Sequence, residues 1–306
     1  LMPYRIHWFK KNLRFQDNEI LLKTDNSFSI LLYIIEPELW LQKDMSQRQW
    51  EFIWESVKSL EKDLAKHNLH LNILSGEASE IFQTLHQKYS FTEVISEQET
   101  GIHWTFERDK KLKSLFNNLN VNWIEYPYFG VKRGNHNRDH WARSIQQILK
   151  KPLINMKKYI NQSLILDFDE HEKPINFYDK TPCPFRQKGG SHQAHDLLET
   201  FLDRRGENYQ REMSSPITAE HSCSRLSPHF AHGTLSLRQA FQLAEKKRFE
   251  IQPTNRVFAK SINAFLSRLY WRSHFIQKLE DEPSIELKSF IPLYDDIRDQ
   301  DEEKLQ

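Results

Sequence analysis

Short apolar runs alternate with amphipathic stretches along the first third of this chain. Five runs rich in β-branched and aromatic residues predict strands at residues 4–9, 29–35, 70–74, 92–96 and 121–124. The second run, SILLYII, is almost wholly apolar, which is typical of a strand buried on both faces of a sheet. Three stretches between these runs repeat apolar residues at helical spacing, at residues 50–64, 78–85 and 106–119. This alternation predicts an α/β domain with a five-stranded, parallel, Rossmann-like sheet and right-handed crossovers.

The hydrophobic pattern changes after this domain. Periodicity is weak from residue 153 to residue 190, where three prolines and two consecutive glycines indicate a connector. Helical spacing returns at residues 195–202, 235–246 and 256–279. We therefore predict three parts: the α/β domain at residues 1–130, a linker at residues 131–190, and an all-helical region at residues 191–306.

Composition narrows the class of protein. Of the 306 residues, 38% are hydrophobic and 28% are charged, which is typical of a globular chain, and the net charge of +1 gives no overall field for a polyanionic partner. The two cysteines, Cys183 and Cys223, are too few for a disulfide framework or a cysteine zinc site. No apolar run approaches the roughly 18 residues of a membrane span, and the start lacks a signal peptide, so we expect a cytoplasmic protein without a membrane partner.

Several sites of known chemistry are not predicted. The chain has only 8 glycines and contains no GxGxxG fingerprint, no P-loop and no GxSxG elbow. Histidines are paired at 136/140 and 192/195, but no third ligand accompanies either pair, so no metal site is expected. A basic stretch over residues 132–158 holds eight Lys or Arg against one acid, Asp139, and we interpret it as a solvated linker.

The stretch CSRLSPHFAHGTLSLRQ, residues 223–239, carries more polar groups than a helix start needs. Ser227 followed by Pro228 predicts an N-cap with proline at the first helical position. Ser224 and Arg225 add a hydroxyl and a guanidinium beside that start, which suits a phosphate group. Helix capping alone and phosphate binding both explain these residues.

A second stretch, FLSRLYWRSHFIQKL at residues 265–279, places Arg268, Trp271, Arg272 and Phe275 close together on a helix. Buried, this stripe would be core with its arginines reaching to solvent. Lining a cavity, it would suit a flat, anionic or nucleobase-like partner.

Five stretches, taken together and in order, resemble the photolyase and cryptochrome family. The opening IHWFKKNLRFQDNEIL is similar to the family pattern WFRxDLRLxDNxAL. The other four follow at residues 96–112, 133–145, 188–202 and 204–239, so that the resemblance spans essentially the whole chain. It implies an N-terminal α/β domain, which in many members holds an antenna chromophore, and a helical domain that binds FAD. Photolyases use the photoexcited reduced flavin to repair pyrimidine dimers in UV-damaged DNA, whereas cryptochromes use the same frame for blue-light signalling.

The resemblance also implies roles for individual residues. The flavin-contacting positions fall on Tyr209, Cys223, Ser224, Arg225, Leu226, Ser227, Phe265, Arg268 and Arg272. The positions that face the DNA lesion fall on Arg268, Trp271 and Arg272. A second, antenna chromophore of unspecified identity is expected with FAD, but its pocket is not predicted, because Glu97, Glu99 and Glu107 are equally well explained as surface carboxylates.

The chain departs from the family pattern in two ways. The position that usually carries a glutamate in the cyclobutane-dimer repair group is Arg268, and an arginine cannot relay a proton as a carboxylic acid can. The family's chain also continues beyond residue 306, so we expect an incomplete flavin pocket, a truncated chain, or a separately encoded C-terminal portion. Residues 280–306 carry ten acids, which fits either a solvated tail or an unfinished helical region. Three functions remain open: a light-driven DNA photolyase, a cryptochrome photoreceptor, and a non-catalytic remnant.

Overall fold

The fold is that of a computed structural model, which describes residues 3–134, 141–168, 175–295 and 297. Five parallel strands form one sheet in the order β3-β2-β1-β4-β5. Their bounds are β1 Tyr4–Phe9, β2 Phe28–Ile35, β3 Leu71–Ser75, β4 Glu93–Glu97 and β5 Asn122–Tyr126. The predicted parallel sheet is therefore confirmed, with strand ends displaced by at most two residues.

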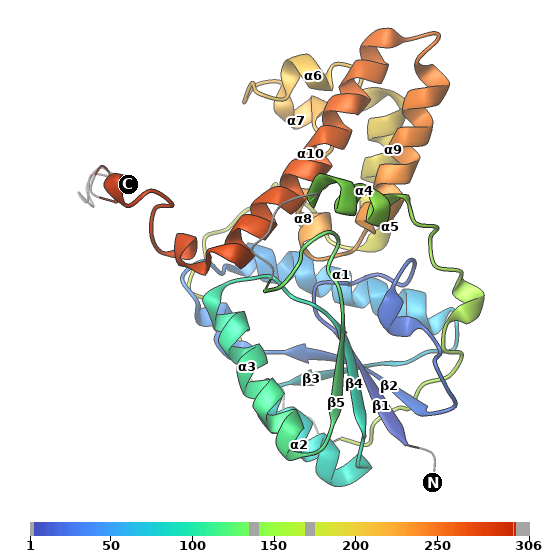
Figure 1. The fold of residues 1–306 in the computed structure, drawn as a ribbon, viewed down its shortest axis with the longest axis vertical. Helices are drawn as coiled ribbons and strands as arrows, with labels where there is room; N and C mark the ends of the chain where they lie inside the picture. Colours follow the sequence, from blue (N-terminus) through green and yellow to red (C-terminus); the bar gives the residue numbers. More distant parts are fainter. Residues whose placement is uncertain (1–2, 135–140, 169–174, 296, 298–306) are drawn as a thin grey trace.

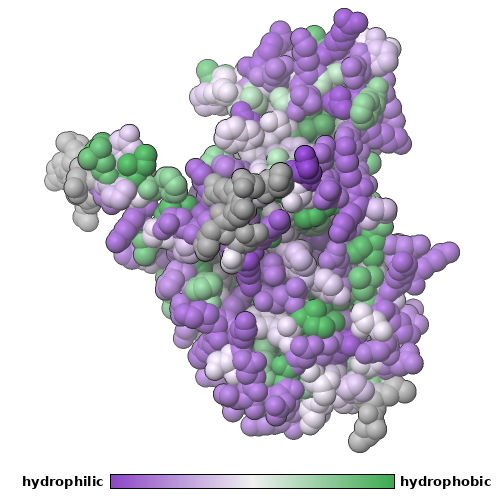
Figure 2. Space-filling view, viewed as in Figure 1, coloured by the Kyte–Doolittle hydropathy of each residue, from purple (hydrophilic) through white to green (hydrophobic). Residues whose placement is uncertain are grey.

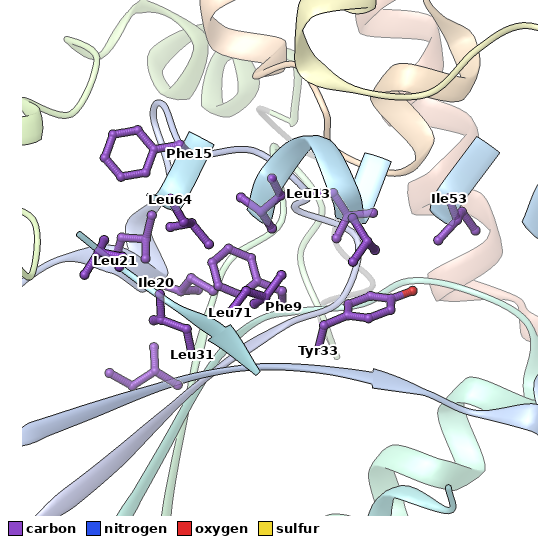
Figure 3. Close-up of a cluster of buried hydrophobic side chains, with 14 of the residues drawn as sticks. Phe9, Leu13, Phe15, Ile20, Leu21, Leu31, Tyr33, Ile53, Leu64 and Leu71 are labelled. Atoms are coloured by element: carbon purple, nitrogen blue, oxygen red, sulfur yellow. The ribbon is translucent and has the colours of Figure 1, made fainter. Parts of the chain in front are cut away.

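Helices cover both faces of the sheet (Figure 1). They are α1 Gln47–Ala65, α2 Ala78–Tyr89 and α3 His103–Asn118, with short 3-10 helices at Glu19–Leu21 and Pro37–Leu41. Side chains from β1 and β2, including Phe9 and Leu31, pack against α1 (Figure 3). On the other face Trp8 and Ile30 pack with Phe82 of α2 and Phe116 of α3. Because β1 and β2 are covered on both faces, their near-continuous apolar sequences are explained.

The rest of the chain is helical and stacks on one end of the α/β domain (Figure 1). The longer helices are α4 Trp141–Lys150, α5 Ser191–Thr200, α9 Leu237–Ile251 and α10 Arg256–Asp281. The shorter ones are η3 Met156–Lys158, η4 Phe201–Arg205, α6 Tyr209–Glu212, α7 Ala219–Ser222, α8 Ser227–Ala231, η5 Pro283–Glu286 and η6 Pro292–Tyr294. Within this region α9 and α10 run side by side, and their apolar faces form one core with α4 and α5.

Two features of the helical region were not predicted from the sequence. Helix α4 lies inside the stretch assigned to the linker, and it contributes Ile145 and Leu149 to the helical core. The chain from Phe201 to Arg205 is a π-helix rather than the end of an α-helix, and such a segment often marks a functional position. Between α4 and α5 the described residues form only the single turn η3, as expected of a connector.

Polar contacts of the β1 loop join the two regions. Buried Asp17 accepts hydrogen bonds from Arg238, with an N–O distance of 2.5 Å, and from the Ser236 hydroxyl at the start of α9. The Leu13 amide donates to the His232 carbonyl at 3.1 Å. These contacts fix the start of α9 against the loop that follows strand β1. Among the described helices none is both long and apolar enough to cross a bilayer.

Candidate functional site

Three guanidinium groups of the helical region lie near Cys223 and Tyr209. Arg205 ends the π-helix η4, Arg225 precedes α8, and Arg268 lies on α10. Arg205 and Arg225 both act electrostatically on the Cys223 thiol, and Arg268 acts on the nearby Tyr209 hydroxyl. We name these three residues the arginine cluster. The fold thus brings together residues from distant parts of the sequence, of which the resemblance had indicated all but Arg205.

Arg205 ties this segment to α5. Its guanidinium donates to the carbonyl of Leu197 at 2.9 Å, to that of Ser224 at 3.3 Å, and to that of Cys223. Sequence reasoning missed this role, and the only signal was an arginine pair placed between an amphipathic helix and Gly206. The hydrogen bonds to Cys223 and Ser224 hold these two residues in place, and the one to Leu197 anchors the guanidinium on α5.

Arg225 has an unusual backbone conformation. Its φ is 63°, in the left-handed region that residues with a Cβ rarely adopt. Its carbonyl accepts a hydrogen bond from the Gln187 amide at 2.5 Å, which fixes this conformation from the linker side. Strained backbone of this kind is concentrated at functional sites. Among the described residues no carboxylate pairs with the guanidinium of Arg225 or of Arg268.

The two weak acids beside the arginine cluster, Cys223 and Tyr209, stay neutral. Burial raises the pKa of the Cys223 thiol, although Arg225 and Arg205 oppose the rise. Burial and the neighbouring Cys223 raise the pKa of Tyr209, against the opposing charge of Arg268. The cluster therefore presents cations and neutral donors, with no compensating carboxylate on Arg225 or Arg268 in the described part of the chain. This set of groups suits a bound anion.

The predicted cap of α8 is wrong by one residue. The residue before the helix is Leu226, which has no capping side chain, and Ser227 and Pro228 are the first two helical residues. The left-handed turn at Arg225 brings the chain into the helix one residue earlier than the proline suggested. The Ser227 side chain is exposed, and the Ser224 hydroxyl accepts from the Leu226 amide at 3.4 Å. Since α8 has only five residues, the candidate anion site depends on side chains and not on a helix dipole.

The other residues that the resemblance indicated for flavin or lesion contact lie partly in the core and partly on the surface. Leu226 and Phe265 are buried, and the Phe265 ring packs against Tyr209 and Phe201. Arg268 and Trp271 are exposed, with the guanidinium 5.7 Å from the centre of the indole ring. Leu226, Phe265, Arg268 and Trp271 lie on or beside the arginine cluster.

Arg272 does not share the exposed stripe that the sequence suggested. It donates to the Phe230 carbonyl at 2.9 Å and to the Tyr128 hydroxyl of the loop after β5. In this conformation Arg272 joins α10 to the α/β domain, whereas Arg268, Trp271 and Phe275 face outward.

Comparisons with known proteins show which family this chain is similar to. The family model described as DNA photolyase matches residues 5–127. Cryptochrome-2 of Gallus gallus is 21% identical over 94% of this chain, and Cryptochrome-1 of Spalax judaei is 22% identical over 94% of it. Residues 5–127 match the DNA photolyase model, and the chain as a whole is similar to cryptochromes. It spans about half the length of these curated relatives, 53% in both cases.

Solved structures of the photolyase/cryptochrome family share the fold. A cryptochrome from Synechocystis sp. PCC6803 aligns with a TM-score of 0.75 and 17% identity, covering 92% of this chain and 62% of that one. A photolyase from Sulfolobus tokodaii, solved with two FAD molecules, aligns with a TM-score of 0.71 and 21% identity over 99% of this chain and 65% of that one. At these identities the likeness concerns the fold, so both the α/β domain and the helices that follow have the family arrangement.

A hollow of about 280 Å³ lies at the carboxyl ends of β1 and β2 in the α/β domain. In open parallel sheets this edge is the usual place for ligands. Buried Arg108 lines the hollow and forms ion pairs with Glu36 at 2.7 Å and Glu99 at 2.6 Å. Burial opposes ionisation of Glu99, but Arg108 and Lys11 outweigh it and hold its pKa well below the usual value.

The carboxylates 97, 99 and 107 are not equivalent. Glu107 is exposed and pairs with Lys110, as expected for a surface residue. Glu97 and Glu99 are buried at the end of β4, so the surface interpretation is wrong for both. They point to different places, because Glu99 lines the hollow with Arg108 whereas Glu97 lies 3.9 Å from Arg14 beside a separate cavity.

Proposed function

We propose that this chain is the flavin-binding part of a light-driven photolyase/cryptochrome flavoprotein, with repair of pyrimidine dimers in DNA as the leading activity. The observation that carries the proposal is the arginine cluster. Three guanidinium groups surround Cys223 and Tyr209, and no described carboxylate pairs with two of them, Arg225 and Arg268. In a chain of this family, such a set of donors fits the diphosphate of FAD.

Each residue of the cluster has a distinct part in this proposal. Arg225 and Arg268 would donate hydrogen bonds to the anionic part of the cofactor, with the Ser224 and Ser227 hydroxyls beside them. Arg205 acts indirectly, because its hydrogen bonds are used on backbone carbonyls. When bound, FAD would supply the photochemistry, and these side chains would hold and orient it.

The lesion would meet the exposed stripe of α10. Trp271 offers an indole face with half of its surface exposed, 49%, and Arg268 lies next to it. An aromatic ring beside a cation suits an unstacked base and its phosphate. Arg268 stands where repair enzymes of the cyclobutane-dimer group usually carry a glutamate. It can stabilise negative charge, but it does not deliver a proton as an acid does.

A blue-light receptor without repair activity is the second candidate, and Arg268 is the observation that favours it. Illumination of a flavin-loaded preparation with an oligonucleotide that contains one thymine dimer separates the two functions. Repair predicts light-dependent recovery of the intact oligonucleotide and none in the dark. Photoreduction of the flavin without recovery of the oligonucleotide would reject repair and support the receptor. A protein that takes up no flavin would reject both and leave the non-catalytic remnant.

We also propose the hollow at the carboxyl ends of β1 and β2 as the position of a second chromophore. Its walls combine the aromatic rings of Tyr33 and Trp40 with the charged groups of Lys10 and Arg108. Rings and fixed charges together suit a flat, polar chromophore. More than one chromophore per chain in the purified protein would support this position, and a single chromophore lost on mutation of the arginine cluster would reject it. A cytoplasmic location stays a prediction from the sequence.

A further inference from the structure

A groove of about 710 Å³ lies between the end of α9 and the first turns of α10, and it carries three cations. They are Arg248, Arg256 and Lys260. A neighbouring hollow of about 450 Å³ shares Lys260 and Asn263 with this groove and continues along α10 to Ser267. Figure 2 shows hydrophilic side chains over this end of the helical region. We name the two hollows together the α9–α10 groove.

The cations of the groove are not neutralised by neighbouring acids. Among the described residues neither Arg256 nor Lys260 has an ion pair or a side-chain hydrogen bond, and the Nε of Arg248 is buried without a partner. The carboxylate nearest in sequence, Glu250, pairs with Lys246. Glu207 lies close to the start of α10, but it accepts a hydrogen bond from the Asn255 side chain and forms no ion pair with the cations of the groove among the described residues. The sequence of α10 also has no acid before Glu280. A local positive field therefore exists in a chain whose net charge is only +1.

An aromatic ring lies at the same place. Phe249 lines the groove with 59% of its surface exposed, and the Arg248 guanidinium lies 4.2 Å from its ring centre. A ring exposed in this way offers an apolar face on which a base can stack. Cations that follow a line together with an exposed ring are the features of surfaces that bind a single nucleic-acid strand.

The cations are also spaced along a line. Arg256, Lys260, Asn263 and Ser267 are exposed and three or four residues apart, so they share one face of α10. At about 1.5 Å per residue this face is roughly 16 Å long, enough for more than one phosphate of a strand. The same face continues toward Trp271.

We propose that the α9–α10 groove binds the sugar-phosphate backbone of single-stranded nucleic acid, with Phe249 stacking on a base. Arg256 and Lys260 pair with phosphates, and Arg248 holds the Phe249 ring in position. The site is separate from the arginine cluster and needs neither flavin nor light. The binding itself does not depend on the proposed function. Only the identity of the strand does, because we expect it to be damaged DNA whose flipped base reaches Trp271.

The test is binding of a fluorescent oligothymidine to the full chain in the dark, followed by anisotropy at several salt concentrations. The neutralising double variant Arg256→Gln/Lys260→Gln is compared with Lys43→Gln/Lys113→Gln, which removes two exposed lysines of the α/β domain. We expect the first pair to weaken binding about tenfold or more and to reduce the slope of log K against log salt by about 1.4, which is ~0.7 for each phosphate that the protein no longer neutralises. The control pair should leave the affinity within about twofold of the unmodified chain and the salt slope unchanged.

A third variant separates stacking from charge. Phe249→Ala should weaken binding about fivefold or more and leave the salt slope unchanged, because stacking releases no counterions. Thymidine monophosphate should compete far more weakly than the oligonucleotide. Binding that is the same in Arg256→Gln/Lys260→Gln as in the control pair would overturn the proposal, and so would thymidine monophosphate that binds as tightly as the strand.

FAD retention measured on the same variants keeps this proposal apart from the proposed function. Normal FAD retention with loss of oligonucleotide binding supports the groove. Absence of FAD retention in every variant contradicts the flavin site and has no bearing on the groove, whose binding is measured without flavin.

Discussion

At the scale of single residues, burial changes the ionisation of Glu97. It is buried at the end of β4, and its Oε2 has no hydrogen-bond partner among the described residues. A cavity of about 180 Å³ adjoins it. Burial raises its pKa from 4.5 to about 7, against the opposing charges of Arg14, Lys10 and Arg272 and together with the like charge of Glu19. The folded chain therefore binds a proton on the Glu97 carboxyl more tightly than the unfolded chain does. The protonated carboxyl contributes stability that is fully present below about pH 4.5 and is lost as the pH rises to about 7.

Replacing Glu97 with glutamine should remove this loss. We expect Glu97→Gln to unfold at higher urea concentration than the unmodified chain at pH above the folded pKa, by about 2 kcal/mol, and to match it in acid. Urea titrations across this pH range measure the difference. Glu107→Gln, at an exposed carboxylate, is the matched control and should show no such pH dependence. A stabilisation by Glu97→Gln that is equal at all pH values would show that its charge is not the cause.

Two adjacent arginines give a second prediction at this scale. Arg205 is half-buried and donates to three carbonyls, whereas Arg204 is exposed with no side-chain partner among the described residues. We expect Arg205→Ala to lower the free energy of unfolding by about 1–3 kcal/mol, because it removes three hydrogen bonds from a part-buried site. Arg204→Ala should change it by less than about 0.5 kcal/mol. Equal effects in chemical denaturation would contradict the role given to Arg205.

At the scale of elements, the junction between the β1 loop and α8 determines how the two regions meet. Gly233 has a φ of 65°, and a Cβ at this position would lie 2.1 Å from the Lys11 carbonyl oxygen. Only glycine allows the two backbones to approach this closely. The contacts of Asp17 with Ser236 and Arg238 lie a few residues further along.

Gly233→Ala should therefore lower the free energy of unfolding by more than the cost of placing an alanine at a positive φ, because the new Cβ also meets the Lys11 backbone. Gly134 is the matched control, because its φ is 64° and nothing lies within 4 Å of a Cβ placed on it. We expect about 1 kcal/mol for Gly134→Ala and clearly more than about 2 kcal/mol for Gly233→Ala, measured by thermal and urea unfolding. Similar losses in the two variants would show that the close approach at Gly233 contributes nothing.

The elements also show what the sequence could and could not predict. Strands β1 and β2 could be predicted because burial on both faces leaves a simple apolar run. Helix α4 could not be predicted, because its two core residues, Ile145 and Leu149, lie within a basic stretch that was interpreted by its charge and not by its hydrophobic spacing. The cap of α8 was displaced because a left-handed backbone at Arg225 carries no signal in an arginine side chain.

At the scale of the whole molecule, long-range contacts explain the rest of the candidate site. The resemblance to the family indicated Tyr209, Arg225 and Arg268, but not that Arg205 would tie the segment to α5. The spacing along α10 also could not show that the Arg272 side chain points toward the α/β domain. That orientation is fixed by its hydrogen bonds to the Tyr128 hydroxyl and the Phe230 carbonyl. Residues that act by supporting a backbone leave little trace in a single sequence.

The central claim is that the arginine cluster holds the anionic part of FAD, and equilibrium dialysis of the purified chain against FAD tests it most directly. We predict saturable uptake that falls at least about tenfold in Arg225→Gln and in Arg268→Gln, since each removes a charged donor. Arg204→Gln, a neutralisation of an exposed arginine close by, should bind as the unmodified chain does. Uptake that is absent, or equal in all four proteins, would contradict the claim.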